Sequence, residues 1–231
     1  MKQTILSIVS LFLFAIGYSQ LKINDYPFGN LDVNVVVIPF GMDSPIKLGT
    51  ISKTGDINFN FTDKLKNIPS HIKESESYKL WYTLFPKCNY GMDMVAEEDN
   101  IFSFDAGALS LWTSDERYVG VIFIVSNEDL MPWVEDPTYM EPVLGSYYKS
   151  VYVEKPFEYK GSCVETKMLD NGEAQVSFDY DLSLKSGFNF IEYKIEHIYK
   201  TDPNVMASFP DKVFVTSVSD VSNCKWIAKY F

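Results

Sequence analysis

Arginine and histidine are almost absent from this chain. Arg117 is the only arginine among the 231 residues, and His71 and His197 are the only histidines. A site that holds a carboxylate or a phosphate through two parallel hydrogen bonds normally uses arginine, so the sequence disfavours an anionic small-molecule substrate. The net charge of −11 also disfavours nucleic acids and anionic membrane surfaces, because such partners need an excess of basic side chains.

Sequence motifs for catalysis and for metal binding are missing as well. The chain contains no G-x-S-x-G, H-E-x-x-H, Walker or G-x-G-x-x-G motif and no C-x-x-C pair. No local motif joins Cys88 or Cys163 to His197, so we expect His197 to pack on a strand and His71 to lie at the surface. The acidic run at residues 97–100 lacks the spacing of a calcium-binding loop and is expected to be solvated. The sequence therefore predicts no cofactor and no metal site.

Cysteine is scarce, with only Cys88, Cys163 and Cys224. In an oxidising compartment three cysteines imply one disulfide and one free thiol. We predict the pair Cys163–Cys224, because both residues lie in the C-terminal half; closing this loop of about 60 residues would stabilise the fold by about 4 kcal/mol. The alternative is that all three are buried as free thiols, which pack well as small apolar groups.

Only the N-terminus carries a long hydrophobic run. Lys2 is followed by the apolar segment 5–16, and Gly17 and Ser19 have the small-x-small spacing of a signal-peptidase site. A bilayer-spanning helix needs about 20 apolar residues, so this segment is too short for a permanent anchor. We therefore predict that residues 1–19 are a signal peptide. The mature chain is then expected in the periplasm or outside the cell, and association with the outer membrane is a further option. We expect no stable membrane insertion after cleavage.

Alternating hydrophobicity is what the chain has in abundance, most plainly within residues 174–199. Apolar and polar residues alternate over 176–184, which is the two-residue period of a strand with one buried face. The segment 185–187 ends in glycine and reverses the chain, so we predict a long antiparallel hairpin. In its second strand the apolar phase shifts at Phe190–Ile191. That shift implies either a bulge or burial on both faces, and we predict a bulge or a change of sheet there.

Similar strand signals recur along the chain at short spacing. Strands are expected at residues 31–40, 46–51, 57–62, 79–85, 101–112, 118–125, 147–159, 163–169, 174–184, 188–199, 213–218 and 224–231. The polar segment 63–78 is expected to be a short helix or an exposed loop. The pattern predicts an all-β fold of antiparallel β-sandwiches, as two packed β-units or one large β-domain, with few short helices.

The proline-rich stretch 127–146 interrupts this pattern, and we interpret it as a connector or a long functional loop. The predicted organisation is therefore an N-terminal β-sandwich-like domain over residues 20–126, with an irregular insertion near 63–100, and a C-terminal β-domain over 147–231. A single continuous β-domain is the alternative.

Aromatic residues are the one compositional excess, at 16% of the chain. Several lie in or just after the proline-rich stretch, and we take Trp133, Tyr139, Tyr147 and Tyr148 as candidate ligand-binding residues. Exposed rings that stack on sugar faces, with nearby acids that accept hydrogen bonds from hydroxyls, would form a site for a neutral glycan. The alternative is that these rings serve core and cross-strand packing.

Carboxylates are abundant enough for glycosidase chemistry, which needs only two. Asp179 and Asp181 share the polar face of their strand, and Glu192 and Glu196 could lie on the facing strand of the predicted hairpin. Alternating acids also occur simply as the solvated face of a half-buried strand. A secreted, glycosidase-like hydrolase that uses paired carboxylates is therefore the alternative function.

One stretch of the chain and its overall layout resemble known families. Leu48-Gly49-Thr50-Ile51 followed by Thr54-Gly55-Asp56-Ile57 resembles carboxypeptidase-regulatory and transthyretin-like modules, whose role is usually structural or adhesive. The whole layout, with Gly187-Phe188-Asn189 where Gly-Trp-Asn is common, resembles uncharacterised exported β-sandwich proteins of Bacteroidota. The resemblance implies an exported β-sandwich.

Together these features favour a non-enzymatic exported protein of the cell envelope that acts as a binding or structural β-sandwich module. Its partner is expected to be an envelope protein or a neutral glycan. The hydrolase remains the alternative.

Overall fold

The computed structural model describes residues 21–23, 26–28, 31–39, 45–59, 65, 68–169 and 172–231. The predicted signal peptide at residues 1–19 lies outside this part of the chain, and so does the end of the third expected strand, residues 60–62. Within the described ranges, no helix is long and apolar enough to cross a membrane.

Strands dominate the described chain, and its helices are short. The strands are β1 (Val33–Val37), β2 (Ile46–Ile51), β3 (Ile57–Phe59), β4 (Ser103–Asp105), β5 (Leu109–Thr113), β6 (Tyr118–Val125), β7 (Gly145–Val153), β8 (Phe157–Leu169), β9 (Gly172–Leu184), β10 (Gly187–Tyr199), β11 (Phe209–Val218) and β12 (Lys225–Tyr230). The α-helices are α1 (Ser70–Lys73), α2 (Leu80–Leu84) and α3 (Met131–Glu135). Short 3-10 helices are η1 (Glu76–Tyr78), η2 (Gly91–Met94), η3 (Glu97–Asp99) and η4 (Glu128–Leu130). The predicted all-β fold with few short helices is confirmed.

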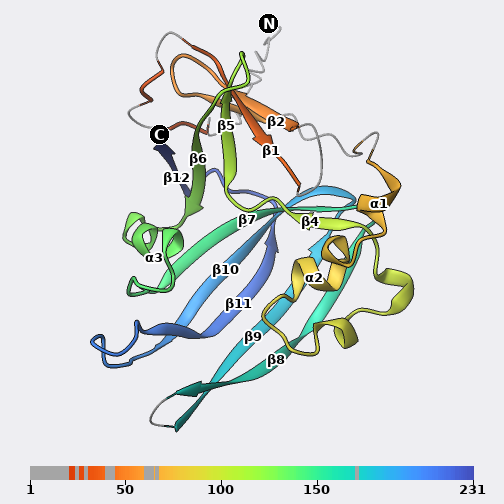
Figure 1. The fold of residues 1–231 in the computed structure, drawn as a ribbon, viewed down its shortest axis with the longest axis vertical. Coiled ribbons are helices and arrows are strands. Elements are labelled where there is room, and N and C mark those ends of the chain that lie inside the picture. The colour runs from red at the N-terminus through yellow and green to blue at the C-terminus, as the bar shows by residue number, and fades with distance from the viewer. Residues whose placement is uncertain are drawn as a thin grey trace, which may run out of the picture.

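The strands form one continuous hydrogen-bonded sheet (Figure 1). Its order is β3-β2-β1-β5-β6-β7-β10-β11-β9-β8, with β12 beside β6 and β4 beside β7. Every pairing is antiparallel except that of β9 with β11, which is parallel. The sheet is therefore mixed, with one parallel pair among antiparallel ones.

The hairpin predicted for residues 174–199 is wrong, although both of its strands exist. β9 pairs with β8 along its whole length and with β11, whereas β10 pairs with β7 and β11. The turn between β9 and β10 is held by Asn189, whose Oδ1 accepts a hydrogen bond from the N–H of Lys185 at 2.9 Å. Its Nδ2 donates to the carbonyl oxygens of Lys185 and Gly187. The two strands diverge from this turn, and β11 fills the space between them.

The bulge or change of sheet predicted at Phe190–Ile191 is also wrong, whereas the alternative, burial on both faces, is confirmed. β10 keeps an unbroken register with β7 through this stretch, and its irregularities against β11 lie further along, around His197. The phase shift instead reflects burial on both faces. Phe188 and Phe190 pack against one core, whereas Ile191 belongs to the other.

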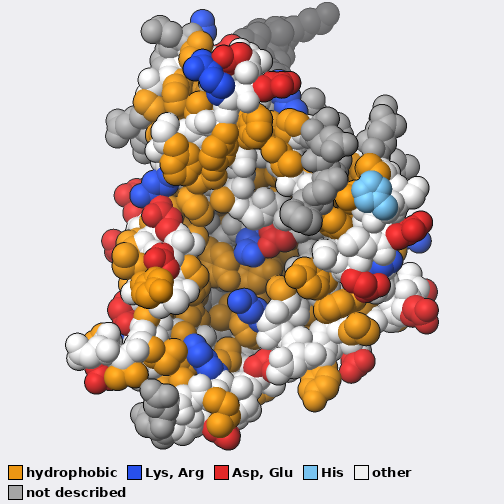
Figure 2. All heavy atoms as spheres, viewed as in Figure 1, with side chains coloured by type: hydrophobic (Ala, Val, Ile, Leu, Met, Phe, Trp, Pro, Cys, Tyr) orange, Lys and Arg blue, Asp and Glu red, His pale blue; other side chains and the backbone are white. Residues whose placement is uncertain are grey.

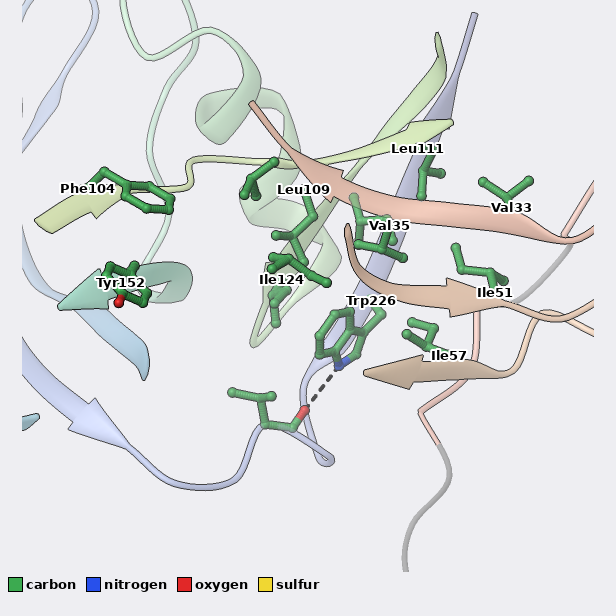
Figure 3. Close-up of a cluster of buried hydrophobic side chains, with 14 of the residues drawn as sticks. Val33, Val35, Ile51, Ile57, Phe104, Leu109, Leu111, Ile124, Tyr152 and Trp226 are labelled. Atoms are coloured by element: carbon green, nitrogen blue, oxygen red, sulfur yellow. Dashed lines mark hydrogen bonds between the residues drawn. The ribbon is translucent and has the colours of Figure 1, made fainter. Parts of the chain in front are cut away.

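Most of the buried side chains lie in two large cores. The first joins β1, β2, β5, β6 and β12, and Figure 3 shows part of it, including Trp226, whose indole N–H donates to the Val221 carbonyl oxygen at 3.1 Å. The second core fills the space between α2 and the strands β7 to β11. Neighbouring residues of β7 enter different cores: Tyr152 lies in the first and Val151 in the second. β7 therefore links the two.

Helix α2 occupies the segment where a strand was predicted, residues 79–85, so that prediction is wrong. Leu80 and Leu84 are four residues apart and fully buried, and Thr83 is buried beside them. This spacing places one apolar stripe on a helix. An apolar run of this length cannot be assigned to strand or helix by periodicity alone.

Cys88 is bonded to Cys163, so the predicted pair Cys163–Cys224 is wrong. The topology gives the reason. Cys163 lies on β8, at one end of the sheet beside the second core, whereas Cys224 precedes β12 and packs against the first core. Cys224 is consequently a free thiol. A disulfide of this kind is typical of proteins in oxidising compartments.

Candidate functional site

A cleft opens on the face of the sheet that carries α2 and α3. Figure 2 shows it as a hollow with a largely hydrophobic floor and several basic side chains. It consists of two adjoining hollows of about 380 and 320 Å³, both lined by Lys87, Trp133, Tyr147 and Lys149. We call these the first and second hollows. Their volumes lie in the range of about 300–1,000 Å³ that small-molecule sites occupy.

The first hollow lies where β6 and β7 separate. β7 pairs with β6 through Tyr147 and Tyr148 and with β4 through residues 151–153, so Lys149 and Ser150 lie between the two pairings. The chain crosses this gap as it passes from β4 to β5. The aliphatic and aromatic side chains that line the hollow include Ala108, Leu109, Ile122, Phe123, Ile124, Val134 and Pro137.

The second hollow lies over β9, β10 and β11. The apolar and aromatic side chains that line it include Val176, Phe178, Tyr180, Tyr193, Phe209 and Val213. β8 contributes the charged side chains of Glu165 and Lys167. These two residues alternate with solvent-facing ones along β8 and share a face with Cys163, because side chains two residues apart on a strand point the same way.

Tyr147 stands at the junction of the two hollows and contacts aromatic rings from two other elements. Its ring stacks on Tyr193, with centroids 5.0 Å apart and planes 9° apart, and Trp133 meets it edge-on at 5.7 Å and 62°. Burial raises the pKa of Tyr147 and of Tyr193, and the nearby negative charge of Asp105 raises both pKa values further. Both phenols therefore stay protonated well above neutral pH, in a cluster that combines apolar ring faces with hydroxyl groups.

Three lysines line the cleft of a protein whose net charge is −11. Lys149 is neutralised by Asp105, with 2.5 Å between Nζ and Oδ2. Lys87 and Lys167 make no ion pair with a carboxylate of the described chain. The Lys167 ammonium instead lies 3.8 Å from the ring centre of Phe209. Burial lowers the pKa of Lys167, and the positive charge of Lys87 lowers it further.

The disulfide fastens the loop after α2 to β8 and so brings Lys87 close to Lys167. Lys87 directly precedes the cysteine that is bonded to Cys163. Asn89, two residues after Lys87, donates its backbone N–H and its side-chain amide to the two carboxylate oxygens of Glu165. The loop is therefore held to the cleft face of β8 at two successive positions. Glu165 is engaged by Asn89 and forms no salt bridge to either lysine.

Two of the residues that line the first hollow, Ser150 and Trp133, each have a buried polar atom without a hydrogen-bond partner among the described residues: Ser150 Oγ and Trp133 Nε1. Ser150 is only 1% exposed. Buried polar groups are normally paired, because leaving one unpaired costs about 1–3 kcal/mol. Both atoms are shielded from solvent, so a molecule in the hollow would reach them only after a local rearrangement.

Three of the four candidate residues predicted from the sequence meet in this cleft. Trp133, Tyr147 and Tyr148 line the first hollow, whereas Tyr139 is 80% exposed and lines neither hollow. The Tyr148 hydroxyl donates to Glu192 Oε1 at 3.1 Å. That these residues bind a ligand stays a prediction.

Sequence reasoning missed the three lysines and Tyr193. One signal was present, because Lys149 stands in the same strand phase as Val151 and Val153, which are fully buried in the second core. A charged residue at an inward-facing strand position is unusual and indicates a special environment.

The carboxylates proposed for a hydrolase do not converge. Asp179 and Asp181 lie on β9, Glu192 and Glu196 lie on β10, and β11 separates the two strands. Asp181 pairs with Lys160 at 2.8 Å. Glu196 interacts with two lysines at 3.3 Å, and their hydrogen bonds lower its pKa. These acids therefore have the surroundings of a solvated strand face.

The histidines and cysteines do not form a catalytic group either. Cys88 and Cys163 are joined in the disulfide, so neither offers a thiolate to His197. His197 is exposed, where packing on a strand was expected, and its Nδ1 lies 2.6 Å from Asp211 Oδ1. His71 is exposed, as expected. Over the ranges that the structure describes, no group of three or more histidine, cysteine, aspartate or glutamate residues is arranged to hold a metal ion.

Comparison of the chain with protein-family models, with curated proteins and with solved structures finds no match.

Proposed function

We propose that this chain is a non-enzymatic exported binding protein and that the cleft is its site for a small organic molecule. The observation that carries the proposal is the junction of the two hollows, where Trp133 and Tyr147 line both. Aromatic side chains offer large apolar contact areas together with polar edges, and they recur in ligand-binding sites for that reason.

Export is supported by two features that do not depend on each other. Residues 1–19 have the charge, apolar run and small residues of a signal peptide. The Cys88–Cys163 disulfide fits an oxidising compartment. We place the protein in the cell envelope, in the periplasm or outside the cell, and the resemblance to exported proteins of Bacteroidota points the same way.

A thermal-shift screen of the mature chain against small apolar molecules and neutral sugars tests the proposal. We expect at least one compound to raise the melting temperature of the wild type. Val176→Phe should remove this shift, because Val176 lines the second hollow and the added ring would fill it. The matched control is Val164→Phe on the adjacent strand, where the side chain is 60% exposed and faces away from the cleft.

The proposal fails if no compound in the screen raises the melting temperature, or if Val176→Phe keeps the full shift. The neutral glycan and the envelope protein expected from the sequence enter the same test as alternative partners, through a polysaccharide array and pull-down with envelope extracts. No observation on the described residues favours the hydrolase alternative, since its carboxylates lie on strands that β11 separates.

A further inference from the structure

We propose that the cleft is selective for amphipathic organic anions, which are molecules with an apolar body and one carboxylate-type group. The apolar body would occupy the first hollow, and the anionic group would lie between Lys87 and Lys167 at the second. This inference rests on the proposed function, because it names the ligand class of the same cleft.

Lys87 and Lys167 make no ion pair with a carboxylate among the described residues, so they give the cleft uncompensated positive charge. Lys87 and Lys167 come from segments far apart in the sequence, and the disulfide holds them near each other. The carboxylate in the cleft lining, Glu165, already binds Asn89 through both oxygens. Two ammonium groups close together repel each other, most strongly where apolar surroundings reduce screening. An anion between them would remove this repulsion.

The electrostatic surroundings of Lys167 are consistent with this geometry. Its pKa is lowered by burial and by the positive charge of Lys87, so its surroundings disfavour the charged form. An anionic ligand would favour the charged form again, which couples anion binding to the full charge of this residue. The interaction should therefore weaken at alkaline pH, where Lys167 loses its proton.

The apolar part of the lining determines what else the anion must carry. The first hollow is walled by aliphatic and aromatic side chains from β5, β6 and α3. A small hydrated ion such as phosphate would leave this surface in contact with water, whereas an alkyl or aromatic body would cover it.

The scarcity of arginine is compatible with this ligand class. Arginine suits planar, bidentate recognition, whereas lysine acts as a compact point charge on a flexible stem. Two lysines at the mouth of an apolar cleft therefore suit one anionic group whose orientation is fixed by the apolar body. The expectation from composition, that an anionic small molecule is disfavoured, applies to bidentate clamps and not to this arrangement.

Isothermal titration calorimetry of the mature, disulfide-bonded protein tests the inference with dodecanoate and its neutral counterpart, dodecanol, both below the concentrations at which they aggregate. We expect dodecanoate to bind at least about tenfold more tightly than dodecanol at neutral pH and low salt. Lys87→Met with Lys167→Met should reduce dodecanoate affinity by about tenfold or more and leave dodecanol affinity unchanged. The matched control, Lys160→Met with Lys225→Met, makes the same change in net charge away from the cleft.

The outcomes separate the two proposals. Equal affinity for both probes, or an equal loss in the cleft and control variants, would overturn the selectivity for anions while leaving a binding cleft in place. If neither probe binds and the thermal-shift screen also finds no ligand, both proposals fail. Circular dichroism of each variant verifies that a loss of affinity is not a loss of fold.

Discussion

Lys149 is a charged residue of the cleft whose charge is balanced within the protein, by Asp105. Its side chain is 33% exposed and that of Asp105 is 27% exposed, so both charges of this pair are largely shielded from water. Asp105 also accepts a hydrogen bond from the N–H of Gly107 at 2.7 Å. The Lys149 ammonium lies 5.7 Å from the ring centre of Tyr193. The pair therefore neutralises the floor of the cleft and ties the β4–β5 crossing to β7.

Asp105→Asn should lower the free energy of unfolding by about 1–3 kcal/mol. The amide keeps the size of the side chain but leaves the part-buried Lys149 ammonium without a charged partner. Urea unfolding measures the loss. In a double-mutant cycle with Lys149→Met, the combined loss should be smaller than the sum of the single losses. Simple additivity would mean that the ion pair contributes nothing to stability.

At the residue scale, the sequence predicts the part of the cleft that lies in one continuous stretch. Trp133, Tyr147 and Tyr148 could be predicted from the sequence because they cluster around the proline-rich segment. Lys87 and Lys167 were not, because only the disulfide and the path of the loop after α2 bring them together. Spacing in the sequence does not show that two such distant residues lie close together in the fold.

The loop after α2 is an element that one covalent bond helps to hold in place. The Cys88–Cys163 disulfide links residues 75 positions apart and fastens the loop to β8. Cys88→Ser with Cys163→Ser should therefore lower the free energy of unfolding by about 2–5 kcal/mol. Urea unfolding of the oxidised wild type and of the double variant measures the difference.

The same variant should bind dodecanoate more weakly, because the loop that carries Lys87 loses its covalent link to β8. Cys224→Ser is the control, since Cys224 is a free thiol and its removal leaves the loop in place. An unchanged unfolding free energy in the double variant would show that the Asn89–Glu165 hydrogen bonds and the second core hold the loop without the disulfide.

At the scale of elements, the sequence predicts strands better than it predicts their partners. The alternation over residues 176–184 is a local property of one strand, and β9 covers it as expected. Pairing is a property of two segments, and the short turn before β10 resembles a hairpin turn even though β11 enters between the strands. The prediction of a strand at residues 79–85, where α2 lies, was wrong for another reason. The few apolar residues of this segment fit both the helical and the strand period.

Tyrosine burial gives the whole molecule a predicted response to alkaline pH. Burial is the main cause that raises the pKa of eight described tyrosines: Tyr26 and Tyr230, each to about 12, and Tyr78, Tyr147, Tyr148, Tyr159, Tyr180 and Tyr193. The unfolded chain releases its phenol protons near pH 10. Stability from these groups is therefore complete below about pH 10 and is lost as the pH rises through the folded-state values.

Thermal unfolding followed by circular dichroism at increasing pH should show a melting temperature that falls steeply above about pH 10. Tyr193→Phe should make this fall shallower, since it removes one buried phenol, whereas Tyr139→Phe should not, because Tyr139 is 80% exposed. Tyrosinate absorbance should appear at a higher pH in the native protein than in the guanidine-unfolded chain. Coincident titration of the two states would contradict the prediction.

The position of β11 has a consequence for when the molecule can fold. β9 and β10 are synthesised first, but each needs β11 to complete its hydrogen bonding, and β6 needs β12 near the C-terminus. A ribosome-bound or truncated chain that lacks residues 209–230 would leave strand edges unpaired, which favours aggregation. The native sheet can therefore form only after residues 209–230 have been synthesised.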